Sequence, residues 1–268
     1  KKIPGSPIAY WLGDRMLKVF ESNRMIGNVL ELKAGLSTGD NTLFQRFWYE
    51  VTKEAISFST LDIVETPKKP ERWYPCHSGG EYRKWFGNHE TVVDWSNNGA
   101  AIRRFGSESG KIRSAVRNEA FYFRKGITWS KISSGKFAAR WRPEGFLFDD
   151  TGRCGFAEDD SILYRSLALF CSCLADKFLR VLCPTLSFTS GEIAKIPYCD
   201  HPNHSVIDGA KEIIAIAKFD WNSYETSWDF TTLPLLQSEH HQPSLAKTYQ
   251  NLRAHWLENT LEMQRLEE

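Results

Sequence analysis

The sequence predicts an α+β fold: a mixed sheet with hairpins, a long buried helix and a helical C-terminal appendage. Short runs rich in β-branched and aromatic residues, separated by Gly, Asn and Ser, are typical of strands and turns. The run 162–182 is apolar on nearly all sides, which indicates a buried helix. From Ser244 onward, apolar residues stand at 245, 249, 252, 256, 263 and 266, a heptad pattern broken at Asn259. We therefore expect one domain over 1–200 and a helical region over 201–268.

The strands of the predicted sheet all lie in the first 160 residues. A helix is expected first, opened by Ser6-Pro7 and continuing to about residue 21, because Ser caps free amides and Pro suits the first helical position. Ser133-Ser134-Gly135 is typical of a turn between two strands. The expected strands are 29–32, 91–95, 127–132, 137–141 and 146–148.

The remaining elements are mainly helical. Asp160 or Ser161 is the expected cap of the helix 162–182, and Cys183-Pro184 ends it. A strand is expected at 185–188. Ser205 is the expected cap of a further amphipathic helix. The heptad pattern from Ser244 predicts a last helix that requires a partner helix.

Composition and charge describe an ordinary globular chain. Of its 268 residues, 41% are hydrophobic and 13% aromatic, which is enough to build a core. No run of eighteen apolar residues and no signal-peptide pattern is found, which favours a cytoplasmic protein with no membrane partner. Its six cysteines lack the spacing of a disulfide framework and are expected to be reduced. The net charge is only +1, but the charge is unevenly distributed along the chain.

The stretch 103–142 carries most of the positive charge. It contains eleven Lys and Arg against two acids, whereas 200–268 contains five against eleven. Aromatic residues such as Phe123, Trp129 and Phe137 lie between the cations, so this stretch is predicted to be folded rather than a disordered tail. Cations on a folded, aromatic-rich surface are suited to a polyphosphate ligand. The residues alone therefore favour a nucleic-acid-binding face.

No catalytic motif is complete. The segment 106–112 is one residue too short for a phosphate-binding P-loop and lacks its Ser or Thr, and no G-x-S-x-G or H-E-x-x-H is present. Two other functions remain open. The aromatics could stack on unpaired bases in a module without sequence preference, or Asp149, Asp150 and the acids at 158–160 could hold Mg²⁺ in a nuclease. We assign no residue to catalysis and none to metal binding.

Several longer phrases resemble a known family. They include GLSTGDNTLFQRFWYEV from Gly35, KWFGN from Lys84 and GITWSKISSGKFAARWR from Gly126, followed by CPTLSFTSGEIAKIP and FDWNSYETSWDF. In this order they resemble the C-terminal half of the adenine-specific DNA methyltransferases of BREX phage-defence systems, the PglX type. The resemblance runs from about residue 3 to about residue 230.

The resemblance implies a division of labour within a longer protein. In that family, an N-terminal domain binds S-adenosylmethionine and carries an N-P-P-[YF] motif that grips a flipped adenine. This chain has no Pro-Pro pair, so no cofactor is expected here, and the segment looks like the target recognition region, similar to the specificity domains of type I restriction systems. The implied partners are double-stranded DNA and the methyltransferase domain of the same polypeptide. Other phage-defence subunits and acidic DNA-mimic inhibitors are further expected partners.

The basic stretch and the resemblance together give a set of expected DNA-binding residues. Arg and Lys can read guanine and Asn can read adenine, but most such contacts only hold the backbone. We expect Ser134, Arg117 and Asn118 to affect the choice of site, and Lys131 and Lys136 to grip phosphates. The full set is Ser37, Thr38, Asn41, Arg46, Arg83, Lys84, Arg103, Arg104, Arg117, Asn118, Lys125, Lys131, Ser133, Ser134, Lys136 and Arg140.

Overall fold

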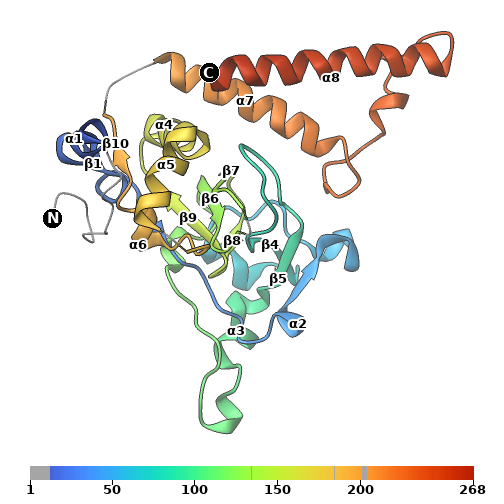
Figure 1. Ribbon diagram of the computed structural model, residues 1–268. Helices are drawn as coiled ribbons and strands as arrows, with labels where there is room; N and C mark the ends of the chain where they lie inside the picture. The colour runs from blue at the N-terminus through green and yellow to red at the C-terminus, as the bar shows by residue number, and fades with distance from the viewer. Residues whose placement is uncertain (1–12, 134, 184, 201–203) are drawn as a thin grey trace.

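The computed structural model describes residues 13–133, 135–183, 185–200 and 204–268 (Figure 1). Two four-stranded sheets form the body, and a pair of long helices lies across one end of it. A two-stranded sheet joins β1 (Arg24–Met25) to β10 (Pro197–Tyr198). The α+β class predicted from the sequence is confirmed.

The first sheet has the strand order β2-β9-β6-β7 and is antiparallel throughout. Its central hairpin pairs β6 with β7, with Ile127 opposite Trp141. This confirms the hairpin predicted around the turn 133–135, although Ser134 itself lies outside the described residues. The strands are β2 (Glu31–Lys33), β9 (Gly152–Phe156), β6 (Gly126–Ser130) and β7 (Ala139–Arg142).

The second sheet has the order β3-β5-β4-β8 and is mixed. The predicted strand 146–148 belongs to this sheet: β8 pairs in parallel with β4 and leaves the hairpin that precedes it in the chain. The predicted strand 185–188 is reduced to a single bridge between Ile132 and Ser187. The strands are β3 (Gln45–Phe47), β5 (Thr91–Asp94), β4 (Trp73–His77) and β8 (Leu147–Phe148).

The predicted long helix 162–182 is wrong, because the chain forms two helices there. α4 (Asp160–Cys171) ends at Ser172, whose extended backbone interrupts the helix, and α5 (Cys173–Leu182) begins immediately afterwards. The Ser172 hydroxyl accepts a hydrogen bond from the Leu174 amide and so caps α5. Asp159, not Asp160 or Ser161, caps α4. The buried faces of both helices pack against the first sheet.

The two C-terminal helices form an arm across the body (Figure 1). α8 (Leu245–Glu267) is capped by Ser244, as predicted, and packs against α7 (His204–Asn222). The partner helix required by the heptad pattern is therefore in the same chain. Ser205 lies inside α7 rather than at its cap, because the helix is already formed at His204. α7 in turn packs against α4.

Four shorter helices complete the fold. α1 spans only the end of the helix predicted over 6–21, and Ser6 and Pro7 lie outside the described residues. Among the described residues, no helix is long and apolar enough to cross a membrane. The four are α1 (Asp14–Ser22), α2 (Asn41–Phe44), α3 (Ser96–Arg104) and α6 (Ser190–Ile193).

Candidate nucleic-acid interface

Two segments that are distant in the sequence form one surface. The amide of Ser37 donates to the carbonyl of Ala115 at 2.7 Å, and the amide of Ala115 donates back to Ser37 at 2.8 Å. The Asn118 side chain donates to the Ala34 carbonyl at 2.8 Å. The loop 34–41 and the segment 113–118 therefore lie side by side, and they bring the expected DNA-binding residues Ser37 and Asn118 near each other.

A hairpin over 105–113 projects from this surface. In Figure 1 it is the green loop that extends below α3, away from the rest of the body. Its base is closed by a hydrogen bond from the Arg113 amide to the Phe105 carbonyl at 2.9 Å. Gly39 packs directly beneath it: a Cβ at this position would lie 2.9 Å from both the Arg113 carbonyl oxygen and the Phe105 ring. The hairpin is thus seated on the loop 34–41.

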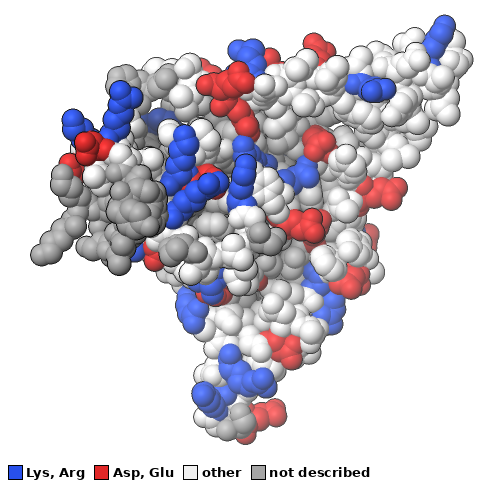
Figure 2. Space-filling model, in the orientation of Figure 1, with Lys and Arg blue, Asp and Glu red and all other residues white. Residues whose placement is uncertain are grey.

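The cations at and next to the projecting hairpin form no ion pair in the described chain, although the hairpin also carries the exposed Glu108 and Arg113 interacts electrostatically with Asp40 in the loop beneath it. Arg104, Lys111 and Arg113 are exposed, and none of them forms an ion pair with a described residue. Arg113 lies over the Phe105 ring, 5.4 Å from its centroid. Figure 2 shows Lys and Arg side chains on this projection together with acidic side chains, as over the body above it.

Lys131 and Arg117 extend the surface toward the β6–β7 turn. The Lys131 ammonium lies 2.6 Å from Asp150, and the Arg117 guanidinium lies 3.9 Å from the same carboxylate. Asp150 also pairs with Arg153 at 2.9 Å, so this one carboxylate faces three cations. Its amide donates to the Leu36 carbonyl, which connects the group to the loop 34–41. The local charge therefore remains positive.

The turn after Lys131 closes on itself. The Ser133 hydroxyl accepts a hydrogen bond from the Gly135 amide and lies 3.3 Å from the Lys136 carbonyl, to which it donates. Lys136 is exposed and has no acidic partner in the part of the chain that the structure describes. We use the name basic edge for the surface defined by six cations: Arg104, Lys111, Arg113, Arg117, Lys131 and Lys136.

Polar side chains of the loop 34–41 are partly committed to the loop itself. Thr38 is buried, and its hydroxyl donates to the Asn41 carboxamide oxygen at 2.5 Å. Asp40 caps α2 and accepts a hydrogen bond from the Thr42 hydroxyl, which lowers the pKa of its carboxyl. Asn41 remains exposed, and Ser37 is half-buried. Asn41 and Ser37 are therefore better placed than Thr38 to contact a ligand.

Arg140 does not lie on any surface, so its expected contact with DNA is wrong. Its side chain is 1% exposed because both faces of β7 are covered: the neighbouring Ala139, which points to the opposite face, is buried as well. The guanidinium donates to the carbonyls of Gly79 at 3.3 Å and Arg83 at 3.4 Å, and it lies 3.4 Å from the Ser130 hydroxyl. Burial lowers the pKa of Arg140 to about 10. This cation holds the loop 79–83 against the first sheet.

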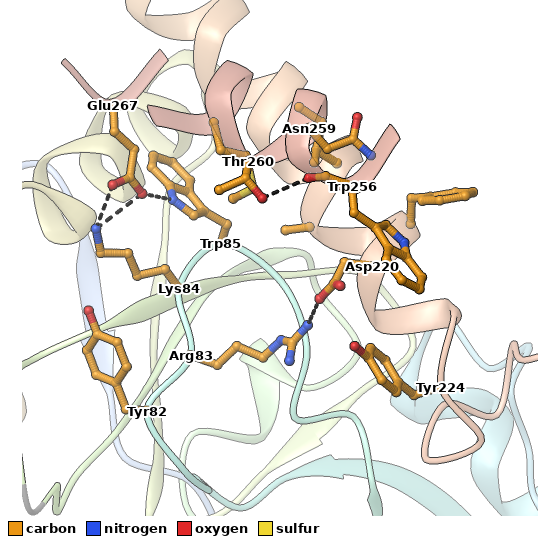
Figure 3. Close-up of a pocket in the computed structure, with 14 residues that line it drawn as sticks. Tyr82, Arg83, Lys84, Trp85, Asp220, Tyr224, Trp256, Asn259, Thr260 and Glu267 are labelled. Carbon is orange, nitrogen blue, oxygen red and sulfur yellow. Dashed lines mark hydrogen bonds and ion pairs between the residues drawn. The ribbon is translucent and has the colours of Figure 1, made fainter. Parts of the chain in front are cut away.

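Arg83 and Lys84 anchor the helical arm (Figure 3). The Arg83 guanidinium pairs with Asp220 of α7 at 2.6 Å, and the Lys84 ammonium pairs with Glu267 of α8 at 2.9 Å. Glu267 also accepts a hydrogen bond from the Trp85 indole at 2.6 Å. A cavity of about 500 Å³ lies between this loop and the two helices. These cations face the arm and lie apart from the basic edge.

Three further expected cations are engaged within the fold. Arg103 pairs with Glu119 and lies over the Trp95 ring. Lys125 pairs with Asp160 at 2.7 Å, and this hydrogen bond raises the pKa of Lys125. The Arg46 guanidinium donates to the carbonyls of Thr42 and Gln45, both at 2.6 Å. None of the three is fully exposed.

Several residues that the two alternative functions would use are engaged within the fold. The aromatics of the basic stretch do not form a stacking platform, because Phe123, Trp129 and Phe137 are core residues. Asp149 is buried and accepts hydrogen bonds from Gln45, Thr151 and Gly152, so its oxygens are occupied. Among the described residues, no three acids, histidines or cysteines are grouped to hold a metal ion.

Sequence reasoning did not include Lys111 and Arg113 of the basic edge among the expected DNA-binding residues. Both lie in the stretch 103–142, but neither was singled out, because the surrounding glycines and serines suggested a failed P-loop. The available signal was Gly106 and Gly110, which adopt φ values of +86° and +75° and flank a short 3₁₀ turn over Ser107–Ser109. Two glycines around small polar residues can mark a slender hairpin tip.

Comparison with known proteins gives a consistent result. No protein-family model matches the chain. It is 42% identical over 247 residues to the adenine-specific methyltransferase PglX of Lacticaseibacillus casei (strain Zhang), covering 90% of this chain and 20% of the relative. It is 38% identical over 256 residues to the adenine-specific methyltransferase BrxX of Escherichia coli O9:H4 (strain HS), covering 93% of this chain and 19% of the relative. The chain thus spans about one fifth of the length of these relatives.

A solved structure is also similar, at a lower level. The type IIL restriction-modification enzyme MmeI, solved in complex with DNA, gives a TM-score of 0.40 at 11% identity, over 85% of this chain and 32% of that one. A TM-score of this size does not establish a common fold. The sequence identity to PglX and BrxX is far stronger, and it extends over nine tenths of this chain. The chain therefore belongs, as a segment, to the family of PglX-type adenine-specific methyltransferases.

Proposed function

We propose that the chain is the DNA target recognition segment of a larger adenine-specific methyltransferase and that the basic edge binds duplex DNA. The observation that carries this proposal is that the six cations of the basic edge outnumber the acids beside them, which are Asp40, Glu108 and Asp150. Polyphosphate backbones bind such surfaces because each neutralised phosphate releases condensed counterions. The partly buried Asp150 keeps Lys131 and Arg117 oriented, while Arg104, Lys111 and Arg113 form no ion pair in the described chain.

The rest of the methylation machinery belongs to other parts of the polypeptide. S-adenosylmethionine and the adenine-gripping motif would be supplied by a separate catalytic domain, and methylation by the whole protein would serve phage defence. Residues 1–200 would form a recognition domain comparable to type I specificity domains. Residues 201–268 would form a connecting or partner-contacting element. The half-buried or exposed Ser37, Asn41 and Asn118 lie beside the cations and supply donors and acceptors for bases or backbone.

The test is equilibrium binding of the isolated chain to a 30-base-pair duplex of random sequence and to the matching single strand, across a salt series. Duplex should bind more tightly, because Phe123, Trp129 and Phe137 of the basic stretch are core residues and cannot stack on unpaired bases. With about six phosphates contacted, log K against log salt should have a slope near −5. Equal affinity for single strands, or a slope near zero, would overturn the proposal. Magnesium-dependent cleavage would instead favour a nuclease.

A further inference from the structure

The basic edge contains one element shaped to enter a groove rather than to lie along a backbone. We propose that the hairpin 105–113 enters the major groove of the duplex and that Ile112, with Lys111 and Arg113, contacts base edges there. This inference rests on the proposed function and deepens it. It moves the expected recognition element from the turn 133–135 to the hairpin 105–113. This hairpin lies in the basic stretch, but none of its residues was in the expected DNA-binding set.

Contacts at its base hold the hairpin in one conformation, as base recognition requires. Its Phe105 ring packs edge-to-face on the buried Phe44, with 5.2 Å between centroids. The Ser114 hydroxyl donates to the Ile102 carbonyl, which fixes the returning strand to α3. Together with the Arg113–Phe105 backbone bond and the seat on Gly39, these contacts hold the base of the hairpin. Pre-organised base contacts avoid the entropy cost of ordering a loop on binding.

The width of the hairpin selects the groove. Two paired backbone segments lie about 5 Å apart before their side chains are added. The minor groove of B-DNA is only about 6 Å wide, whereas the major groove is about 12 Å wide and admits a two-stranded ribbon. The tip is slender because it consists of Gly106, the short turn Ser107–Ser109 and Gly110. A hairpin of this size fits the major groove without deforming the duplex.

Ile112 is the residue that most strongly suggests base contact. It is 58% exposed, although isoleucine is among the side chains most often buried. It stands between Lys111 and Arg113, so an electrostatic grip on phosphates would place it directly against DNA. An apolar side chain in the major groove finds the 5-methyl group of thymine, and Arg or Lys finds guanine O6 and N7. The three residues thus match two bases that the groove distinguishes.

The experiment begins with selection of bound duplexes from a random pool by the wild-type chain, by Ile112→Ala, and by Leu236→Ala as the control. Leu236 is similarly exposed, at 69%, but lies in the arm. The wild type and the control should select the same short consensus containing thymine and guanine. Ile112→Ala should lose the preference for thymine while binding random duplex with unchanged salt dependence, because no charge is removed.

Base analogues then locate the contact within the selected site. Uracil in place of the critical thymine removes one methyl group and should weaken wild-type binding by about three- to fourfold, but leave Ile112→Ala unaffected. 7-Deazaguanine removes N7 and should weaken wild-type binding by about tenfold. Arg113→Ala and Lys111→Ala should each be tested for loss of that sensitivity, which at least one should show.

Several results would overturn the inference. The wild type could select no consensus, or Ile112→Ala could select the same consensus with the same response to uracil. Sensitivity to inosine, which lacks the minor-groove amino group, without sensitivity to either major-groove analogue would place the hairpin in the other groove. In each case salt-dependent duplex binding would remain, and the proposed function would stand. Absence of duplex binding by the wild type would instead remove both.

Discussion

Two regions of this protein look alike in sequence and differ in what their cations do. The segment 72–88 and the segment 103–118 both combine Arg and Lys with aromatic residues, and both contain paired or closely spaced glycines. In the first, Arg83 and Lys84 are paired with Asp220 and Glu267, which lie more than 130 residues further along the chain. In the second, Lys111 and Arg113 form no ion pair within the described chain. A cation's availability therefore depends on which distant acids the fold brings to it.

Some cations of the basic stretch are neither exposed nor paired with an acid, because they are buried. Arg140 and Arg142 occupy the interior with no carboxylate partner among the described residues, and Arg142 lies over the Phe148 and Phe156 rings. Such guanidinium groups stabilise by hydrogen bonding to backbone carbonyls and cannot reach a ligand from outside. The eleven basic residues of 103–142 thus divide into exposed, acid-paired and buried groups, which have different expected effects when replaced.

The largest effect is expected from Arg140→Ala. This change leaves a cavity and deprives the Gly79 and Arg83 carbonyls of a donor, so it should lower the free energy of unfolding by about 2–4 kcal/mol. Arg104→Ala, at an exposed site, should change it by less than about 0.5 kcal/mol. Urea unfolding of both variants provides the measurement. Arg140→Ala with wild-type stability but lost DNA affinity would make Arg140 a ligand-binding cation after all.

A smaller effect concerns the buried imidazoles. Burial lowers the pKa of His89 to about 3 and also depresses the pKa of His77, so both are neutral when folded. Unfolded histidines take up protons below about pH 6.5, so stability is full above that pH and falls as the pH decreases toward the folded pKa. His89→Phe should reduce the stability lost between pH 7 and pH 5 by about 2 kcal/mol. An unchanged acid dependence in urea unfolding would contradict this.

The pairing of Lys84 with Glu267 should be detectable but modest. Burial lowers the pKa of Lys84, and the hydrogen bond and charge of Glu267 more than offset this and raise it. A double-mutant cycle with Lys84→Ala and Glu267→Gln should give a coupling of about 0.5–1 kcal/mol that weakens in salt. Duplex affinity should not change. If Lys84→Ala flattened the slope of log K against log salt by about one unit, Lys84 would contact a phosphate. The contrast between the segments 72–88 and 103–118 would then be wrong.

The smallest effect is expected from Lys125→Ala. Its partner Asp160 lies at the start of α4, and both side chains are about 40% exposed. Solvent screens such pairs, so the free energy of unfolding should change by less than about 0.5 kcal/mol. The salt slope of duplex binding should also stay within experimental error. A flattened slope would show that DNA displaces Asp160 and that acid-paired cations also belong to the interface.

The sequence allowed the elements to be predicted better than the site. Strand alternation and turn chemistry predicted the β6–β7 hairpin, and a cap with a heptad pattern predicted α8, because these signals are local. The break at Ser172 was missed because an all-apolar pattern is the same for one helix or two. Arg140 was misassigned because alternation does not say which face of β7 a second layer covers. Ion pairs such as Lys84–Glu267 depend on the tertiary fold and leave no local signal.

The central claim is that the cations of the basic edge, Lys111 and Arg113 of the projecting hairpin among them, contact DNA and that acid-paired cations outside this edge do not. The most direct test compares the salt dependence of duplex binding for Lys111→Ala/Arg113→Ala with that for Arg180→Ala/Lys211→Ala. The second variant removes the same charge from two exposed cations that pair with Asp176 and Asp208. The hairpin variant should flatten the slope, by up to about two units if each cation neutralises one phosphate, and the control should leave it unchanged. Equal flattening in both would mean that net charge, rather than the hairpin, governs binding.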